Sequence, residues 1–396
     1  MTTLPAATDV LGWLDDVAAV RRTAGLQRVL RPRSALEPVI DLASNDYLGL
    51  SRDPRVVDGA IQATRTWGAG STGSRLVTGS TELHAQLEDE LAAFCGAAAA
   101  LVFSSGYTAN LGALTALSGP GALVVSDAAS HASLVDACRL SRARIVVTPR
   151  ADVAAVAAAL ASRSERRALV VTDSVVSVDG GLAPLAQLHA VCRQHDAVLL
   201  ADEAHGFGVC GPGGRGAVAG LGLAGEPDVV VTMSLSKSLG SQGGAVLGSR
   251  VVIDHLVNTA RSFIFDTGLA PPAAGAALAA LQVLQSEPAL PARVRAAAAA
   301  LATAAGVGPP TAAVVSVVLG EPQGAVEAAA ECLRRGVRVG CLRPPSVAAG
   351  TCRLRLTAHA VLTDSDLARV AQVLTEVLAR PGRPLGGAVP AAETVR

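Results

Sequence analysis

The sequence contains one lysine, Lys237, among 33 basic residues, and all the others are arginines. A lysine amine can condense with an aldehyde to form an imine, whereas a guanidinium group stays protonated and cannot. A chain that uses arginine wherever charge alone is needed therefore indicates that an amine is required at position 237. The alternative is a lysine retained by chance on the surface, and the surrounding motifs favour the first interpretation.

Asp202 follows the apolar run Ala197–Ala201, just as Lys237 follows the next apolar run along the chain. Neighbouring parallel strands end at the same sheet edge, so we expect the two side chains to lie close together. An aspartate there can keep a pyridine nitrogen protonated, which makes the ring an electron sink. Ala204 could then lie flat against the ring, and His205 could reach a ring hydroxyl.

The Asp202–His205 motif has two other interpretations. Asp-Glu-Ala-His also occurs in helicases, but the sequence lacks the Gly-x4-Gly-Lys-[Ser/Thr] phosphate loop that a nucleotide motor requires. An aspartate that ends a strand is also often no more than a helix cap. The nearby Lys237 favours the cofactor interpretation over both.

Two segments could bind a phosphate group. Ser104–Asn110 joins a predicted strand to a predicted helix, where backbone amides and serine hydroxyls form an anion cradle. The hydroxyls of Ser234 and Ser236, just before Lys237, can add donors. The alternative for the first segment is an ordinary capped helix.

His131 and a glycine-rich segment complete the candidate residues. His131 follows the predicted strand Ala122–Val125, so its ring could stack on the pyridine opposite Ala204; a lone histidine at such a place is more often structural. Gly68–Gly73 matches the dinucleotide fingerprint Gly-x-Gly-x-x-Gly, but it follows the helix-like run Pro54–Trp67 where that fingerprint needs a strand. We interpret it as a flexible loop on the substrate side.

The elements that must position these residues can be predicted from the periodicity. Between about residues 98 and 250, short apolar runs alternate with helical patterns, which is typical of a mostly parallel α/β sheet. The predicted strands are Ala99–Phe103, Ala122–Val125, Arg144–Thr148, Ala168–Thr172, Ala197–Ala201, Asp228–Met233 and Gly244–Gly248. The predicted helices between them include Tyr107–Leu117, Ser133–Leu140, Val153–Ala161 and Leu185–His195.

The pattern divides the chain into four parts. Residues 46–270 form the cofactor-binding domain, and residues 271–380 have an α+β pattern that predicts a smaller C-terminal domain. Residues 1–45, with a predicted helix around Val10–Leu30, are expected to pack with the small lobe. Residues 381–396 are rich in Pro, Gly and Ala and are predicted to be a disordered tail.

The composition excludes several function classes. Acidic and basic residues are equal at 33 each, which gives no basis for a nucleic-acid or anionic-membrane partner. The seven cysteines include no Cys-x-x-Cys pair and are interpreted as reduced thiols. No signal sequence or membrane-spanning run is apparent, so we expect a soluble cytoplasmic protein, and we expect no metal site.

Taken together, the motifs resemble those of the α-oxoamine synthases, a family of fold-type I pyridoxal-phosphate enzymes. The resemblance covers nearly the whole chain and is carried by Ser44–Leu50, Gly70–Arg75, His84-x-x-Leu87-Glu88, Asp202–His205, Lys237, Arg343–Pro345 and Arg353–Arg355. It implies an α/β fold with a mostly parallel seven-stranded sheet and a smaller α+β C-terminal domain. It also implies pyridoxal 5′-phosphate as the cofactor and a homodimer with shared active sites.

The resemblance implies a role for each candidate residue. Lys237 would carry the cofactor and act as the base, Asp202 would pair with the pyridinium, and His131 would stack on the ring. The other cofactor contacts would be Ser105, Gly106, Tyr107 and Ser234 at the phosphate, Ser177 and His205 at the ring hydroxyl, Ala204 on the ring face, and Thr267 at the phosphate of the partner subunit. Asn45 and Arg355 would hold an amino-acid carboxylate, and Arg28 the far carboxylate of a dicarboxylic acyl chain.

The sequence departs from the family pattern at two places. Asp266 stands where a small hydroxyl residue is common, and Thr148–Arg150 replaces a more usual His-Asn-Asp. Neither position belongs to the expected chemistry. An acid near a phosphate is unfavourable, however, and this puts the placement of Thr267 in question.

Within the family the motifs are most similar to those of the branch that condenses L-alanine with pimeloyl-CoA, releasing CoA and CO2, in biotin synthesis. The alternatives are the same acyl transfer to glycine from a short acyl-CoA, or from a long acyl chain. A catalytically silent binding subunit belongs to a different class, and the intact Lys237, Asp202 and His131 argue against it. A nucleotide-binding dehydrogenase is a more distant alternative.

Overall fold

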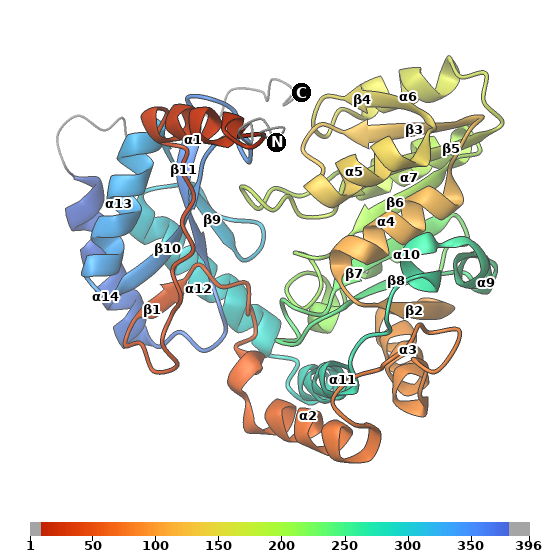
Figure 1. Cartoon of the computed structure of the whole chain (residues 1–396), viewed down its shortest axis with the longest axis horizontal. Coiled ribbons are helices and arrows are strands. Elements are labelled where there is room, and N and C mark those ends of the chain that lie inside the picture. Colours follow the sequence, from red (N-terminus) through yellow and green to blue (C-terminus); the bar gives the residue numbers. More distant parts are fainter. Residues whose placement is uncertain (1–8, 380–396) are drawn as a thin grey trace, which may run out of the picture.

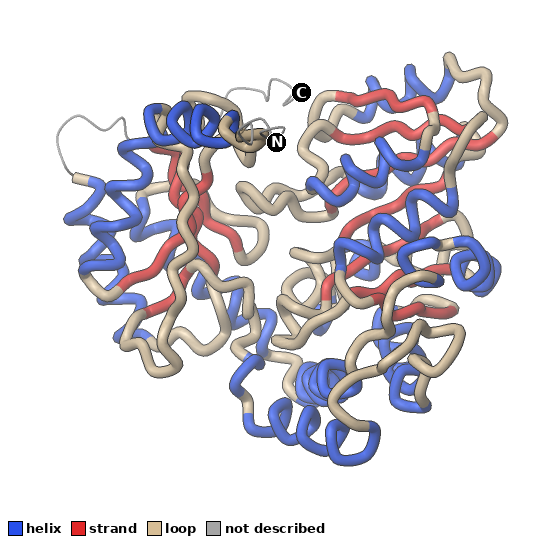
Figure 2. Tube along the Cα trace, in the orientation of Figure 1, coloured by secondary structure: helices blue, strands red, loops and turns tan. Residues whose placement is uncertain are grey.

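The structure, a computed structural model, describes residues 9–379 as a large α/β lobe and a smaller α+β lobe (Figure 1). The tail predicted for residues 381–396 lies outside the described residues. Figure 2 shows the strands gathered in two separate sheets, one in each lobe. Among the described residues, no helix is both long and apolar enough to cross a membrane.

The large lobe is built on a seven-stranded sheet with the strand order β2-β8-β7-β6-β5-β3-β4. Strand β8 runs antiparallel to both of its neighbours, and the other pairs are parallel. The central strands are mostly Val, Leu and Ala and are almost completely buried, as expected for a parallel sheet covered by helices. The strands are β2 (Ala99–Phe103), β3 (Ala122–Asp127), β4 (Arg144–Thr148), β5 (Arg167–Asp173), β6 (Val198–Asp202), β7 (Val229–Ser234) and β8 (Gly244–Gly248).

Helices cover both faces of this sheet (Figure 1). One apolar layer joins the sheet to α4 (Gly106–Leu117), α5 (Ala132–Ser141), α9 (Arg250–Thr259) and α10 (Arg261–Ile264). The opposite layer joins it to α3 (Glu82–Cys95), α6 (Val153–Ala161), α7 (Leu185–Gln194), α8 (Ala217–Gly220) and α11 (Pro271–Ser286). The next helix, α12 (Leu290–Ala305), packs against the small lobe. The strands and helices predicted for this lobe are all present, which confirms the predicted fold class.

The smaller lobe contains a four-stranded sheet with the order β1-β10-β11-β9. Strand β1 (Ile40–Leu42) comes from the N-terminal segment and pairs in parallel with β10 (Val337–Leu342). The other elements are β9 (Val314–Gly320), β11 (Cys352–Thr357), α13 (Pro322–Arg334) and α14 (Asp364–Leu378). The N-terminal residues thus complete the sheet of the small lobe, although the predicted domain boundaries at residues 45 and 270 stay a prediction.

The first helix is shorter than predicted. Helix α1 (Trp13–Thr23) lies across one end of the small lobe (Figure 1), but it does not extend to Leu30. The chain turns at Ala24 and Gly25, where Gly25 has φ = 66° and the amide of Leu26 bonds back to the carbonyl of Arg21. A left-handed glycine is a common helix stop, so the predicted bounds Val10–Leu30 were wrong.

Helices α2 (Pro54–Trp67) and α11 cross at two glycines. A Cβ atom on Gly275 would lie 2.5 Å from the Cβ of Ala63, and one on Gly59 would lie 2.7 Å from that of Ala279. The two backbones can approach this closely only because neither glycine has a side chain. A short 3-10 turn at Leu50–Arg52 precedes α2, and another lies at Pro212–Gly214.

Candidate active site

The predicted site residues come together at the carboxyl edge of the large sheet. Strand β6 ends at Asp202, and β7 ends at Ser234, three residues before Lys237. The register places Asp202 beside Asp173 of β5 on one side and Thr232 of β7 on the other. The loop after β3 leads to His131, and the loop after β2 leads to the start of α4. Four loops therefore converge on one edge, as expected for a ligand site in a parallel sheet.

The Asp202 carboxylate is buried and held in one orientation. Its Oδ1 accepts the amide of Ala204 at 2.8 Å, and its Oδ2 accepts the side-chain amide of Asn110 at 2.7 Å. Asn110 also donates to the hydroxyl of Ser133 at 2.8 Å and accepts from that of Thr232 at 2.5 Å. Sequence reasoning missed Asn110, and the signal that could have revealed it is a buried polar residue in a helix whose other buried residues are Ala, Gly and Leu.

Lys237 lies in the turn that follows β7, close enough to Asp202 and Asp173 for their charges to act on its amine. Burial lowers the pKa of the Lys237 amine, and the charge of Arg355 acts in the same direction. The two carboxylates oppose this shift. A larger neutral fraction of the amine favours both nucleophilic attack and proton abstraction, because only the neutral form has a free electron pair.

His131 begins α5 and caps it. Its ring Nδ1 accepts the amide of Ser133 and lies 2.8 Å from the Ser133 hydroxyl, and its own amide donates to Asp173 Oδ1 at 3.1 Å. Burial lowers the pKa of the His131 imidazole, so the ring is neutral at neutral pH. Ser133 thus holds the ring at Nδ1 and Asp173 holds the backbone of His131, at the edge where a planar ligand would lie.

The sequence predicted His205 but not its partner Tyr47, although Tyr47 lies within the Ser44–Leu50 motif. The hydroxyl of the fully buried Tyr47 is hydrogen-bonded to Nδ1 of His205. Burial raises the pKa of Tyr47 to about 12 and lowers that of His205 well below its usual value. The tyrosine is therefore the donor and the neutral imidazole the acceptor. This arrangement places the ring proton of His205 on Nε2, which can donate it to a ligand.

Arg355 of β11 brings the small lobe to the site. Its Nη1 donates to Asn45 Oδ1 at 3.0 Å, while its Nε and Nη2 are buried without a hydrogen-bond partner among the described residues. Unpaired buried donors are costly, and a guanidinium edge with two free N–H groups matches the two oxygens of a carboxylate. The predicted pair of Asn45 and Arg355 is thus in contact and has donors left for a carboxylate ligand.

Ser105, Gly106 and Ser234 lie together at the start of α4. Ser105 caps the helix and accepts the amide of Thr108 at 3.1 Å, and the hydroxyls of Ser234 and Ser236 are 2.7 Å apart. A Cβ on Gly106 would lie 3.2 Å from the Cβ of Ser234, so the absence of a side chain lets the helix start approach β7. The free amides at this helix start can bind a phosphate group.

Four predicted residues are not joined to the others by any contact seen among residues 9–379. Ser177 lies in a turn after β5. The Tyr107 hydroxyl is bonded to the carboxylate of Asp136. The group of Tyr107 that could bind a phosphate at the helix start is therefore its backbone amide. Arg28 is exposed and donates to the carbonyl of Pro344 at 3.3 Å, and Thr267 is exposed and bridged to Ser74.

The Gly68–Gly73 loop is tied to the segment around Thr267. The Ser71 hydroxyl donates to the carbonyl of Leu269 at 2.6 Å, and the amide of Gly268 donates to the carbonyl of Gly73 at 2.9 Å. Close by, the carboxylate of Asp266 accepts the hydroxyl of Ser104, one residue before Ser105. The loop therefore lies beside the phosphate cradle, and two hydrogen bonds hold its second half.

Comparisons with known proteins agree with this geometry. Residues 37–374 match the aminotransferase class I and II family. An 8-amino-7-oxononanoate synthase of Mycolicibacterium gilvum is 65% identical over 376 residues, which cover 95% of this chain and 99% of that protein. One of Mycobacterium tuberculosis is 65% identical over 93% of this chain and 96% of its own length. The chain belongs to the 8-amino-7-oxononanoate synthase family.

Solved structures extend the comparison to the fold and the cofactor. The S. paucimobilis serine palmitoyltransferase with bound PLP–myriocin has a TM-score of 0.86 and 30% identity, covering 93% of this chain and 98% of that one. The 8-amino-7-oxononanoate synthase of Francisella tularensis has the same fold, with a TM-score of 0.73 and 24% identity over 86% of this chain and 98% of that one. This member of the 8-amino-7-oxononanoate synthase family is a pyridoxal-phosphate enzyme. Its residues fit the cofactor, because an amine, a buried carboxylate and a helix start that can bind phosphate lie at one sheet edge.

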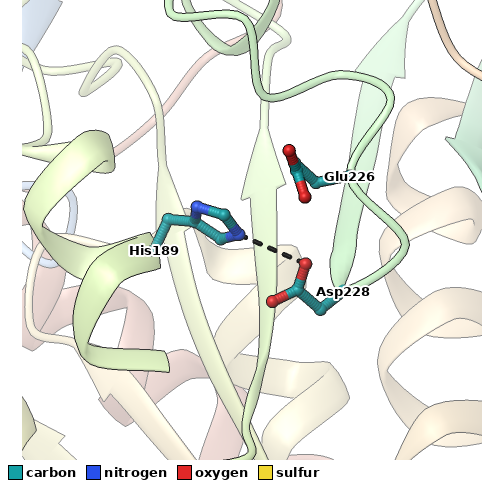
Figure 3. A group of neighbouring side chains, drawn as sticks. All are labelled: His189, Glu226 and Asp228. Atoms are coloured by element: carbon teal, nitrogen blue, oxygen red, sulfur yellow. Dashed lines mark hydrogen bonds and ion pairs between the residues drawn. The ribbon is translucent and has the colours of Figure 1, made fainter. Parts of the chain in front are cut away.

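A separate polar cluster lies against α7. The ligand atoms of His189, Glu226 and Asp228 lie within 4.8 Å of one another, and His189 Nε2 is 3.2 Å from Asp228 Oδ1 (Figure 3). Arg193 pairs with Glu226 at 2.8 Å and lies 3.9 Å from Asp228. The protein itself therefore balances the negative charge of this cluster, and we interpret it as an ion-pair network.

Proposed function

We propose that the chain catalyses the condensation of L-alanine with pimeloyl-CoA to give 8-amino-7-oxononanoate, CoA and CO2. The observation that carries this proposal is that Lys237 and Asp202 lie at the same sheet edge as the Asn45–Arg355 pair, in a chain of this family. An amine, a pyridinium partner and a carboxylate binder together are what a decarboxylative condensation of an amino acid requires.

The residues divide the work of the reaction. Bound pyridoxal phosphate withdraws electrons from the α-carbon of the amino acid. The carboxylate of Asp202 keeps the pyridine nitrogen protonated, and Nε2 of His205 donates to the ring oxygen. Arg355 and Asn45 orient the alanine carboxylate, and the neutral Nζ of Lys237 removes the α-proton and later returns one.

The phosphate and the acyl chain are proposed to be bound by the remaining predicted residues. The amides of Gly106 and Tyr107 and the hydroxyls of Ser105 and Ser234 would hold the phosphate, with Ser177 near the ring oxygen. His131 and Ala204 would lie on opposite faces of the ring. Arg28 would bind the far carboxylate of the pimeloyl group, because it lies exposed beside the Arg343–Pro345 motif.

We also propose a homodimer in which Thr267 reaches the partner's phosphate. The loops joined by the bridge between Ser74 and Thr267 expose large apolar side chains, with Val77 79% and Phe265 70% exposed. Apolar side chains of this size beside a site indicate a surface that another chain covers. Mixing two inactive variants tests this: Lys237→Ala and Thr267→Asp should form one complete site per mixed dimer, and no recovery of activity would contradict a shared site.

We also propose that the protein is cytoplasmic. All seven cysteines are free thiols in the described structure, and all but Cys341 are buried. This supports a reducing compartment, because unpaired cysteines in such number are unusual in exported proteins.

The experiment that tests the proposed function is a thiol-release assay on the purified protein loaded with cofactor. Pimeloyl-CoA and acetyl-CoA are each supplied with L-alanine and with glycine. Release only with pimeloyl-CoA and L-alanine would support the proposal, whereas release with acetyl-CoA and glycine would assign the chain to the alternative acyl transfer. A protein that binds the cofactor, turns yellow and yet releases no thiol would contradict both.

A further inference from the structure

Asp173, at the end of β5, is a second buried carboxyl group beside Asp202. The register of β5 and β6 pairs these two residues directly, so both side chains leave the sheet at the same edge. The two are buried to a similar degree, with Asp173 3% and Asp202 6% exposed. No role in the reaction proposed above requires a second acid at this place.

The two oxygens of Asp173 have unequal surroundings. Oδ1 accepts the amide of His131 at 3.1 Å, whereas Oδ2 is buried and has no hydrogen-bond partner among the described residues. Asp202, in contrast, accepts one N–H group on each oxygen. A buried carboxylate oxygen without a donor is costly, and the cost is much smaller when that oxygen carries a proton.

The charges around Asp173 support the un-ionised form. Burial raises the pKa of Asp173 well above its usual value, and the nearby charge of Asp202 raises it further. The amide of His131 and the charge of Lys237 oppose the shift, and Asp127 at the end of β3 adds to it. Two adjacent buried carboxyl groups cannot both ionise cheaply, so the single negative charge resides on Asp202, which has the two donors.

We propose that Asp173 is a positioning residue of the pyridoxal-phosphate site that acts as an un-ionised acid. Its Oδ1 holds the amide at the start of α5, and with it the His131 ring, at the sheet edge. Its Oδ2 keeps the proton, so that Asp202 alone presents a negative charge to the pyridine nitrogen. The inference rests on the proposed function for the identity of the ligand, but the state of Asp173 can be measured without it.

Two neutral variants test whether Asp173 acts through its acceptor oxygen and needs no negative charge. Asp173→Asn keeps an acceptor for the His131 amide and stays neutral, whereas Asp173→Ala removes the acceptor. We expect Asp173→Ala to weaken the binding of pyridoxal phosphate by about tenfold, as for the loss of one hydrogen bond in the site, and Asp173→Asn to recover most of that loss. Fluorescence titration of the cofactor-free protein with pyridoxal phosphate measures both.

Asp127→Asn is the control, because Asp127 also ends a strand at this edge and accepts two backbone amides, those of Ala129 and Ala151. Its charge has the smallest effect on the pKa of Asp173 among the groups named above. Infrared difference spectra of cofactor-free protein at neutral pH should show a carboxylic-acid carbonyl band for wild type minus Asp173→Asn. The Asp127→Asn difference should lack this band.

A carboxylate band in the first difference would overturn the proposal. So would an Asp173→Asn variant that binds pyridoxal phosphate as weakly as Asp173→Ala does. A wild-type protein that bound no cofactor would contradict the proposed function instead, and the infrared spectra would still decide the state of Asp173.

Discussion

At the scale of single residues, the sequence was most informative where one residue type is chemically irreplaceable. Lys237 could be identified because a guanidinium cannot replace its amine, and Asp202 because it ends an apolar run. Asn110 and Tyr47 could not be found in the same way, since their roles depend on partners far along the chain, Asp202 and His205. A polar residue such as Asn110 stands out among the small apolar residues of its helix, but its partner is known only once the fold is known.

Replacing Lys237 with alanine tests its role as the base. We expect the turnover number to fall by about 10³-fold or more, because no other amine in the chain can move the α-proton. The thermal midpoint should stay close to that of the wild type, which shows that the fold survives. Near-normal turnover by this variant would refute the assignment.

Replacing Tyr47 with phenylalanine tests the orientation of His205. The variant keeps the packing but loses the donor to Nδ1, so the Nε2 proton of His205 is no longer fixed. We expect the affinity for pyridoxal phosphate to fall about tenfold, as measured by absorbance titration. The control is Tyr107→Phe, which removes the other tyrosine hydroxyl, a donor to Asp136, and keeps the Tyr107 amide at the helix start. Equal effects of the two substitutions would contradict this role.

At the scale of elements, the apolar runs predicted the strands well, because burial on both faces leaves little choice of residue. The first helix was overestimated, since an apolar pattern cannot by itself show that the chain turns at Gly25. The parallel pairing of β1 with β10 was also beyond the sequence, because a three-residue strand has no periodicity to recognise.

Glu203, the residue after β6, has a buried carboxyl group that should make the stability of the protein depend on pH. It accepts the Ser174 hydroxyl at 2.8 Å and the Val218 amide at 2.6 Å, and burial raises its pKa from 4.5 to about 7. As the pH rises, Glu203 loses its proton in the unfolded chain before it does so in the folded protein. Its contribution to the unfolding free energy is therefore full below about pH 4.5 and is lost as the pH rises through 7. The total loss is about 3 kcal/mol.

Glu203→Gln should remove this dependence. Urea unfolding at pH 5 and pH 8 should give a smaller difference in unfolding free energy for the variant than for the wild type. Glu226→Gln, at a surface ion pair with Arg193, serves as the control and should keep the wild-type difference. An unchanged difference in Glu203→Gln would show that Glu203 does not titrate in this range.

The crossing of α2 and α11 depends on glycine. A methyl group on Gly275 would lie 2.5 Å from the Cβ of Ala63, so Gly275→Ala forces the helices apart. We expect it to lower the unfolding free energy by about 2 kcal/mol. Gly324→Ala, in helix α13, is the matched control, because its added methyl group meets nothing within 4 Å and should be neutral or slightly stabilising. Equal stabilities in urea unfolding would argue against a tight crossing.

At the scale of the whole molecule, the site is shared between the lobes. Lys237 and Asp202 come from the large sheet, whereas Arg355 comes from β11 of the small one. The sequence suggested both groups of residues, but their meeting depends on how the lobes pack. Within that packing, Nε and Nη2 of Arg355 are buried and have no hydrogen-bond partner among the described residues.

Arg355→Lys should separate substrate binding from cofactor binding. The lysine keeps the charge but not the two-point geometry, so we expect the KM for L-alanine to rise by about 10- to 100-fold. The affinity for pyridoxal phosphate should stay within about threefold of the wild type, since one unit of positive charge is retained. The control is Arg338→Lys, whose ion pairs with Glu37 and Asp41 lie elsewhere in the small lobe. A KM rise in both variants would contradict a specific role for Arg355.

The pairing of β1 with β10 also bears on how the protein is made. Asp41 and its neighbour Arg338 are 297 residues apart in the chain. During synthesis the ribosome releases β1 early, and this strand stays without its partner until β10 has emerged. The large sheet can form first, with Lys237 already in place, but Asn45 and Arg355 can meet only after the last strands have been translated. The contact that is proposed to hold the amino-acid carboxylate therefore needs residues that are translated late, and a chain that stops before Arg355 should be unable to bind the amino acid.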